Sequence, residues 1–249
     1  MGASMDSYLN GYNDPRLPVY FQPVTEGDNK GEYRGVANGM PNPQQDDYKA
    51  MSAPNVQEKS TDSPLRWMMA SEVAFLRAEG AMRGWTAEMG GTAEEFYNKG
   101  IELSFLENGL SADAAARYAA DETSKPTDFT DVSTANTKYN ISALGKITIK
   151  WNAGASEEEQ LERIITQKWI AMFPNGTEAW SEFRRTGYPL IFPVRSNYPT
   201  SGVDTNKQIR RMVFPQSEYS NNGAAVQEAV KLLGGPDNGG TKLWWDKKN

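Results

Sequence analysis

The sequence contains no cysteine and no histidine among its 249 residues. The chain therefore cannot form disulfides, supply a thiol nucleophile, or build a zinc site from thiolate or imidazole ligands. A Ser-His-Asp relay is excluded for the same reason. Any catalysis would have to rest on carboxylates, on a Ser-Lys pair or on tyrosine.

Other features are missing as well. No stretch approaches the roughly 18 apolar residues of a membrane-spanning helix, and the first residues lack the pattern of a signal peptide. The net charge of −6 and the pI near 5.0 argue against a nucleic-acid partner, which requires clustered lysine and arginine. We find no phosphate-binding loop, no Ser-x-x-Lys, no Gly-x-Ser-x-Gly and no helix-loop-helix calcium loop. The sequence thus predicts neither a metal nor a cofactor.

Turn-forming residues are abundant at the N-terminal end. Residues 1–4 are typical of an expression scar, so we exclude them from the expected fold. Residues 5–62 are rich in Gly, Pro, Asn, Asp and Gln, and their apolar runs, such as Leu17 to Phe21, are short. We expect an extended, loop-rich segment with one short strand, and its many aromatic residues favour order.

Helical patterns begin at Ser63, an N-cap followed by proline, and predict a helix that ends near Gly84. On a helical wheel, Val73 and Leu76 belong to a wide apolar arc, while the alanines between positions 70 and 81 form a second, small-residue side. We therefore expect this helix to be packed on two sides.

A second helix is predicted from the capping box formed by Thr92 and Glu95 to about Asn108, followed by a shorter helix from Ser111 to about Asp121. The first two helices are joined by a short glycine-containing loop. They should form an antiparallel helical hairpin.

A second hairpin is predicted further along the chain. Residues 123–155 are polar and turn-rich, with one short strand expected at Ile147–Trp151. The hairpin follows at about 156–173 and 177–185, and a last helix is expected at about 224–233.

These elements predict a mostly α fold with little β, built of tetratricopeptide-like helical hairpins and long ordered irregular loops. The full repeat pattern is absent, and two hairpins alone would not make a stable solenoid. We expect residues 63–249 to be the helical region, packed with 5–62 as one domain.

Charged residues on the helices suggest one cluster. Glu72 and Glu79 fall inside the apolar arc of the first helix, so both carboxylates need partners. Lys168 lies on an apolar face of the second hairpin, and Arg184 and Arg185 lie just beyond it. We predict a buried structural ion-pair cluster of these five residues. The alternative is a glycosidase acid and base, but Glu72 and Glu79 lie about 10 Å apart along the helix axis, beyond the usual carboxylate spacing.

Aromatic residues invite a carbohydrate-binding interpretation, because indoles and phenols can stack on sugar rings. We expect Trp67, Trp169 and Trp180 to be packed between helices. As ligand contacts we propose Tyr33, Asn42 and Tyr48, because loops over a rigid scaffold are the usual place for a site.

Four segments together resemble the SusD/RagB-like proteins of Bacteroidota, in their C-terminal portion: 8–17, 71–80, 156–189 and 241–246. The resemblance implies a cell-surface outer-membrane lipoprotein that binds an oligosaccharide or peptide and works with a SusC-like TonB-dependent transporter. It also implies an N-terminal half and a lipid-anchoring cysteine that have no counterpart here, so we expect a fragment or a shortened member whose only membrane attachment is that anchor.

Two other functions compete with nutrient binding. One is a helical-hairpin scaffold for protein partners, which large apolar patches without a sugar-sized groove would favour. The other is a carboxylate-based glycoside hydrolase, which requires Glu72 and Glu79 to meet in an accessible cleft. We expect no enzyme activity.

Overall fold

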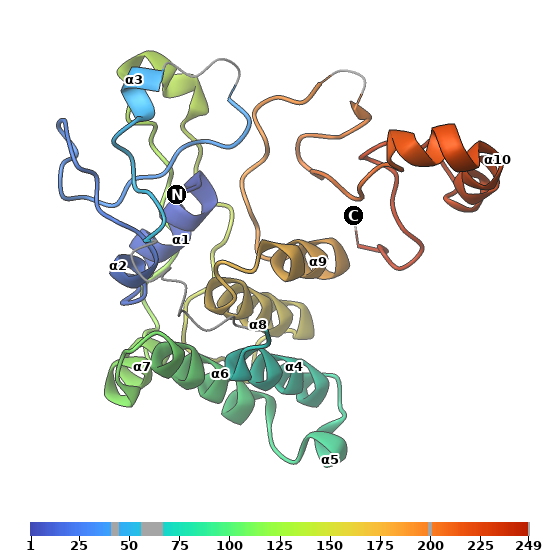
Figure 1. Ribbon diagram of the computed structural model, residues 1–249. Helices are drawn as coiled ribbons and strands as arrows, with labels where there is room; N and C mark the ends of the chain where they lie inside the picture. The colour runs from blue at the N-terminus through green and yellow to red at the C-terminus, as the bar shows by residue number, and fades with distance from the viewer. Residues whose placement is uncertain (41–44, 56–66, 199–200, 249) are drawn as a thin grey trace.

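The structure of the chain is a computed structural model, and it describes residues 1–40, 45–55, 67–198 and 201–248. Within these ranges the regular structure is helical, with three isolated bridges and no strand. This confirms the mostly α fold class (Figure 1). In the same ranges, no helix combines the length and apolar character needed to cross a bilayer.

The chain opens with helix α1 (Ala3–Gly11) and, after a tight corner, the short helix α2 (Leu17–Tyr20). Excluding residues 1–4 from the fold is wrong, because Ser4 is buried and its hydroxyl accepts a hydrogen bond of 2.9 Å from the Phe192 amide. The short strand expected within residues 5–62 is not found among the described residues of that segment. Proline in the first turn of α2 carries a φ that suits a helix, so the short apolar run is helical.

The corner between α1 and α2 is tied to the rest of the molecule by Arg16, which is fully buried. Its guanidinium forms an ion pair with Asp14 and donates hydrogen bonds to Ser104 at 2.9 Å and Gln167 at 3.1 Å. The Tyr118 hydroxyl donates to the same aspartate at 2.8 Å. The N-terminal segment is therefore built into the core of the helical region.

The first hairpin consists of α4 (Ala70–Met82), the short α5 (Thr86–Met89) and α6 (Ala93–Glu107). The capping box predicted at the start of α6 is confirmed: each of its two residues accepts a hydrogen bond from the backbone amide of the other, at 2.7 and 3.2 Å. The cap predicted at Ser63 lies outside the described residues. Helix α4 begins later than predicted, because Met69 has extended backbone and serves as its N-cap residue.

The orientation of α4 differs from the prediction. Its small-residue side faces the core, where Ala78 is fully buried and Phe75 packs against Gly100 of α6. Val73 and Leu76, expected to be packed, are each 42% exposed. Small residues allow the close helix approach that buries Phe75, and this contact determines which side of α4 turns inward.

The remaining helices of the body are α7 (Ala112–Ala119), α8 (Glu157–Ala171) and α9 (Gly176–Thr186). Side chains cap the last two: Ser156 caps α8 and Asn175 caps α9, each accepting a hydrogen bond from a backbone amide of the first turn. The second predicted hairpin is thus present.

Between α7 and α8 the chain is irregular apart from the 3-10 helix η1 (Thr134–Tyr139). The strand predicted at Ile147–Trp151 does not form. Ile149 is nevertheless completely buried, and its carbonyl accepts a hydrogen bond from Tyr97. These apolar residues fill the core from an extended segment that has no neighbouring strand.

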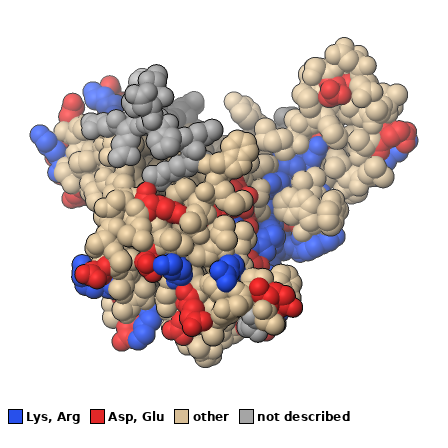
Figure 2. Space-filling model, turned by 60° about the horizontal axis from the view of Figure 1, so that its bottom comes forward, with Lys and Arg blue, Asp and Glu red and all other residues tan. Residues whose placement is uncertain are grey.

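The C-terminal part forms a lobe that carries helix α10 (Gln216–Leu232) and projects from the body (Figures 1 and 2). The helix starts earlier than predicted and is kinked at Asn222; only Val226 on it is buried. Two ion pairs hold the segments of the lobe together, Arg210 with Asp246 and Arg211 with Asp237.

One main core joins the N-terminal helices to the two hairpins. It includes Tyr8 and Leu9 of α1, Phe75 of α4, Phe105 of α6 and Ile164 of α8. The loop-rich N-terminal segment and the helical region therefore share the same buried side chains.

Candidate ligand-binding site and the buried ion-pair cluster

The three residues proposed as ligand contacts lie in different settings. Tyr33 is half-buried against the main core, and its carbonyl accepts a hydrogen bond of 2.8 Å from Asn10. Tyr48, at the end of the short helix α3 (Gln45–Tyr48), donates its hydroxyl to Asp131 at 2.8 Å. Asn42 lies outside the described residues. Both tyrosines thus make contacts with other residues of the protein.

Near these tyrosines the chain forms a loop that doubles back on itself. Val24 donates its amide to the carbonyl of Glu32 at 2.8 Å and accepts from Gly31 at 2.9 Å. Gly27 and Gly31 have φ of 79° and 90°, a left-handed conformation that favours glycine. At the base of the loop, Phe21 is buried against Phe173, with ring centroids 4.8 Å apart.

An open groove with a volume of about 520 Å³ runs along this loop. It is lined by residues of α2, the loop and one neighbouring segment: Pro18, Phe21, Gln22, Pro23, Val24, Thr25, Lys30, Gly31 and Asn55. The volume is within the range of about 300–1,000 Å³ that small-molecule sites occupy. The walls combine apolar surface with amide, hydroxyl and ammonium groups, which is the chemistry that recognises the faces and hydroxyls of a sugar.

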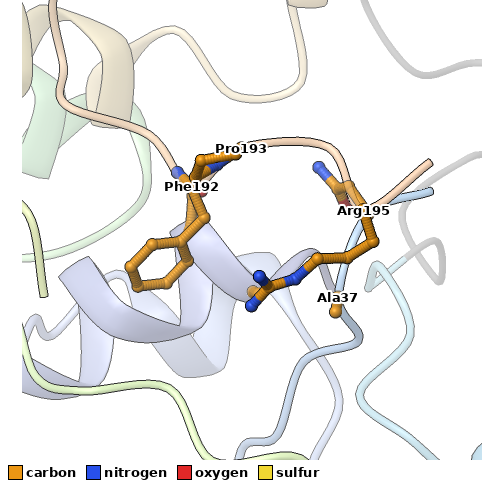
Figure 3. A pocket seen from close by; sticks show the side chains of 7 residues that line it. Ala37, Phe192, Pro193 and Arg195 are labelled. Carbon is orange, nitrogen blue, oxygen red and sulfur yellow. Dashed lines mark hydrogen bonds between the residues drawn. The ribbon is translucent and has the colours of Figure 1, made fainter. Parts of the chain in front are cut away.

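A second concavity, between α1 and residues 192–195, is not suited to a ligand (Figure 3). It is lined in part by Ala37, Phe192, Pro193 and Arg195, and it has no room for a water molecule. The Arg195 guanidinium donates a hydrogen bond to the carbonyl of Tyr139. This concavity is a packing feature.

The hairpins are joined by an ion pair between α4 and α9. The guanidinium of Arg185 donates two hydrogen bonds to the carboxylate of Glu79, at 2.7 and 2.6 Å. Arg83 approaches the same carboxylate at 2.8 Å. Burial acts to raise the pKa of Glu79, but the hydrogen bonds and charges of Arg185 and Arg83 outweigh it and hold the pKa below its ordinary value.

Glu182 of α9 links this pair to Lys168 of α8. Its carboxylate lies 2.6 Å from Arg185 and 3.1 Å from the ammonium of Lys168, which is also 3.2 Å from Glu178. Sequence analysis misses Glu182, although its spacing of three residues from Arg185 on one helix is a usable signal. Burial raises the pKa of Glu72, the nearby Lys168 lowers it, and Glu178 and Glu182 add to the rise.

Arg184 takes no part in this cluster. Its guanidinium lies between the rings of Trp180 and Trp245, at 3.5 and 4.8 Å from their centroids, and donates a hydrogen bond to the carbonyl of Arg210. Adjacent residues on a helix point in different directions, so Arg185 faces α4 while Arg184 anchors the C-terminal lobe.

The geometry gives no support to a hydrolase. Of the two carboxylates that this alternative requires, Glu72 has a raised pKa, but the Glu79 carboxylate is held by Arg185 and Arg83, so the two are not free to act together as acid and base. Within the described residues, no group of three or more potential metal ligands converges.

The tryptophans divide into packed and exposed sets. Trp169 packs on Tyr8, with ring centroids 5.6 Å apart, and the Trp180 indole donates to the carbonyl of Ile209. Trp67 is not packed as predicted: it precedes α4 and is 87% exposed. Trp244, in the C-terminal lobe, is exposed as well.

Comparison with known proteins identifies the family. The protein-family model described as SusD and RagB outer membrane lipoprotein matches residues 1–246. A search of curated proteins gives no match. The chain is similar to a chitin-binding SusD homologue from Flavobacterium johnsoniae, with 42% identity, a TM-score of 0.89, and coverage of 100% of this chain and 50% of that one.

Two further solved structures agree. A SusD-like protein from Bacteroides thetaiotaomicron is 45% identical with a TM-score of 0.90, over 99% of this chain and 50% of that chain. A SusD homologue from Bacteroides uniformis is 44% identical with a TM-score of 0.89, over 99% and 49%. The chain spans about half the length of these relatives. The resemblance seen in the sequence is confirmed, and the chain belongs to the SusD-like family.

Proposed function

We propose that this chain is part of a cell-surface nutrient-binding protein that captures glycans and works with a SusC-like TonB-dependent transporter. The observation that carries the proposal is the family match over residues 1–246. A chitin-binding homologue at 42% identity supports a carbohydrate ligand. In this function the native protein is held at the outer membrane by a lipid anchor, and it performs no chemistry.

Within the chain, we place the ligand contacts in the N-terminal loop segment. The groove along residues 18–31 has the volume and the mixed lining that a sugar requires. Its polar groups include Gln22, Lys30 and Asn55, which can bond to hydroxyl or acetamido groups. Tyr33, Asn42 and Tyr48 belong to the same segment of chain and remain part of the proposal.

The test is a binding screen of this chain against plant, microbial and host oligosaccharides and mixed peptides, read by tryptophan fluorescence. Chitin oligosaccharides come first because of the Flavobacterium relative. Saturable binding of one class, weakened by Lys30→Ala or Asn55→Ala, supports the proposal. The matched control is Lys231→Ala on α10, far from the groove, which should leave the affinity unchanged.

A helical scaffold for protein partners is the second candidate. Exposed aliphatic side chains on α4 favour it, because contiguous apolar surface often marks an interface. The groove favours ligand binding, since a scaffold has no need of a cavity with convergent polar groups. No saturable response to any oligosaccharide or peptide of the panel would favour the scaffold.

A further inference from the structure

The chain contains six asparagine-glycine pairs, which begin at positions 10, 38, 108, 175, 222 and 238. In this dipeptide the backbone nitrogen of glycine can attack the side-chain carbonyl carbon of asparagine, because glycine has no Cβ to hinder the approach. The reaction needs an asparagine side chain that is free to turn and a backbone that is free to move. The surroundings of the six pairs differ in both respects.

Two of the pairs are held by hydrogen bonds from the side-chain amide. Asn10 in α1 donates to Asp6 at 2.7 Å and to the carbonyl of Tyr33 at 2.8 Å. Asn108, after α6, donates to the carbonyl of Ser104 at 2.7 Å. Neither side chain can turn toward the following glycine without breaking these bonds, so we expect both pairs to react slowly.

At two further pairs both the asparagine side chain and the glycine amide are bonded. Asn175 caps α9, and Gly176 donates its amide to the carbonyl of Pro174 at 2.8 Å. The side-chain oxygen of Asn238 accepts hydrogen bonds from two backbone amides at 2.9 and 3.0 Å, and the Gly239 amide donates to a carbonyl at 3.1 Å. The nitrogen that would attack is therefore engaged in each pair.

The pair that begins at Asn38 is exposed, but its backbone is tied to a neighbouring segment. The Asn38 carbonyl accepts a hydrogen bond of 2.9 Å from the Arg195 amide. Gly39 lies against the same segment, where an added Cβ would be 2.7 Å from Val194. Ring closure would have to move this packed backbone, so we expect slow reaction here too.

The pair in α10 lacks these restraints. Asn222 is exposed, and its backbone departs from helical geometry, with φ of −142° and ψ of 34° inside the helix. Its side-chain amide approaches the carboxylate of Glu218 at 3.5 Å on the exposed surface, which is a weak contact. A Cβ added to Gly223 would meet nothing within 4 Å. The Asn222 side chain can therefore turn, and the backbone beside it has room to move.

We propose that Asn222 is a site of spontaneous deamidation. The Gly223 nitrogen attacks Cγ of Asn222, the new N–Cγ bond forms, and the Cγ–Nδ2 bond breaks. The proton of the attacking amide leaves with the side-chain nitrogen as ammonia, and a cyclic imide remains. Water then adds to one of the two imide carbonyls and breaks its bond to nitrogen, which gives aspartate or isoaspartate. The reaction consumes one water, releases one ammonia and oxidises nothing.

The product changes the C-terminal lobe in two ways. It places a new negative charge four residues after Glu218 on the same helix, where like charges repel. Isoaspartate also carries the chain through its side-chain carbon, so the backbone becomes one atom longer at the kink of α10. Only Val226 of this helix is buried, so little packing opposes the change. We expect the body of the protein to remain folded when Asn222 is modified.

The test is incubation of the folded 249-residue chain at mildly alkaline pH, followed by peptide mapping with mass spectrometry. All six pairs are then measured in one sample. We expect the mass change of an amide replaced by a carboxylate to accumulate at Asn222 about tenfold faster than at Asn108 or Asn175, because those pairs must first break their hydrogen bonds. Isoaspartate in the α10 peptide would identify the imide, since direct hydrolysis gives aspartate alone.

Gly223→Ala is the matched variant. Its Cβ meets open space, so the fold is kept, but it hinders the attacking nitrogen and should slow the reaction by about tenfold. In urea, where the restraints are released, the six pairs should react at similar rates. Equal rates at all six pairs in the folded chain, a faster reaction at another pair, or a Gly223→Ala variant that reacts as fast as the parent would overturn the proposal.

Discussion

Arg16 and Asp14 form a fully buried ion pair, with a nitrogen of the guanidinium 2.6 Å from a carboxylate oxygen and neither side chain exposed. Buried charges are tolerated only where their hydrogen bonds are satisfied, and here Ser104, Tyr118 and Gln167 complete the network. Because these partners belong to α6, α7 and α8, the pair fixes the N-terminal corner to the helical region.

Breaking this pair should be costly. Arg16→Met leaves the carboxylate of Asp14 buried without its cation, and we expect a loss of about 3–5 kcal/mol in the free energy of unfolding. Urea denaturation measures it. The double variant Asp14→Leu with Arg16→Met removes both charges and should lose less than the single variant. A loss below about 1 kcal/mol for Arg16→Met would show that the network is not important for stability.

The ion pair of Glu79 with Arg185 predicts that the folded chain loses stability in acid. The pKa of Glu79 is lower in the folded chain than its ordinary value of 4.5, so its stabilising effect is present above about pH 4.5 and is lost as the pH falls below it. Glu79→Gln should cost about 1–3 kcal/mol at pH 7, with the difference from the parent shrinking in acid.

Glu102 provides the control for that measurement. It pairs with Lys99 on the surface of α6, where the Lys99 side chain is 50% exposed and that of Glu102 is 36% exposed. Glu102→Gln should change the free energy of unfolding by less than about 0.5 kcal/mol. Equal effects of the two substitutions would contradict a structural role for the Glu79 pair.

Glu162 predicts the opposite dependence on pH. One of its carboxylate oxygens is buried without a hydrogen-bond partner, and burial, only partly offset by Arg163, raises its pKa from 4.5 to about 7. A raised carboxyl pKa means that stability is lost as the pH rises from about 4.5 through 7. Glu162→Gln should therefore stabilise the chain at pH 8, by about 1–2 kcal/mol after solvent screening, and have little effect at pH 4. The melting temperatures of the parent chain and of Glu162→Gln, measured at pH 8 and at pH 4, test this prediction.

Gly100 should resist substitution. A Cβ added there would lie 2.7 Å from the ring of Phe75, so Gly100→Ala should destabilise the hairpin by about 1–3 kcal/mol despite the better helix propensity of alanine. Gly223→Ala in α10 meets open space and should be neutral or stabilising by up to about 1 kcal/mol. Similar results for the two alanine variants would contradict the close approach of α4 and α6.

Local signals in the sequence predicted the helices whose ends are fixed by side chains. Thr92, Ser156 and Glu95 each satisfy backbone amides within three residues, so their pattern is readable without tertiary structure. The helical course of residues 17–20 and the start of α4 were harder to predict. The buried Arg16 network and the packing of Phe75 determine those regions, and neither is visible in a local pattern.

In the candidate site, too, some features follow from local sequence and others depend on tertiary packing. The pairing of Glu79 with Arg185 could be anticipated because both charges fall near apolar faces, but the choice of Arg185 over Arg184 depends on how α9 is rotated against α4. The groove is formed by a loop whose course depends on Gly27 and Gly31, so its lining could not be read from composition.

The most direct test of glycan binding by the N-terminal loops is hydrogen–deuterium exchange of this chain with and without the oligosaccharide that binds best in the screen. Our account predicts slower exchange in residues 18–31 and around Asn55 on saturation, with no change in α10. Protection confined to other segments, or no saturable binding of any oligosaccharide, would contradict it.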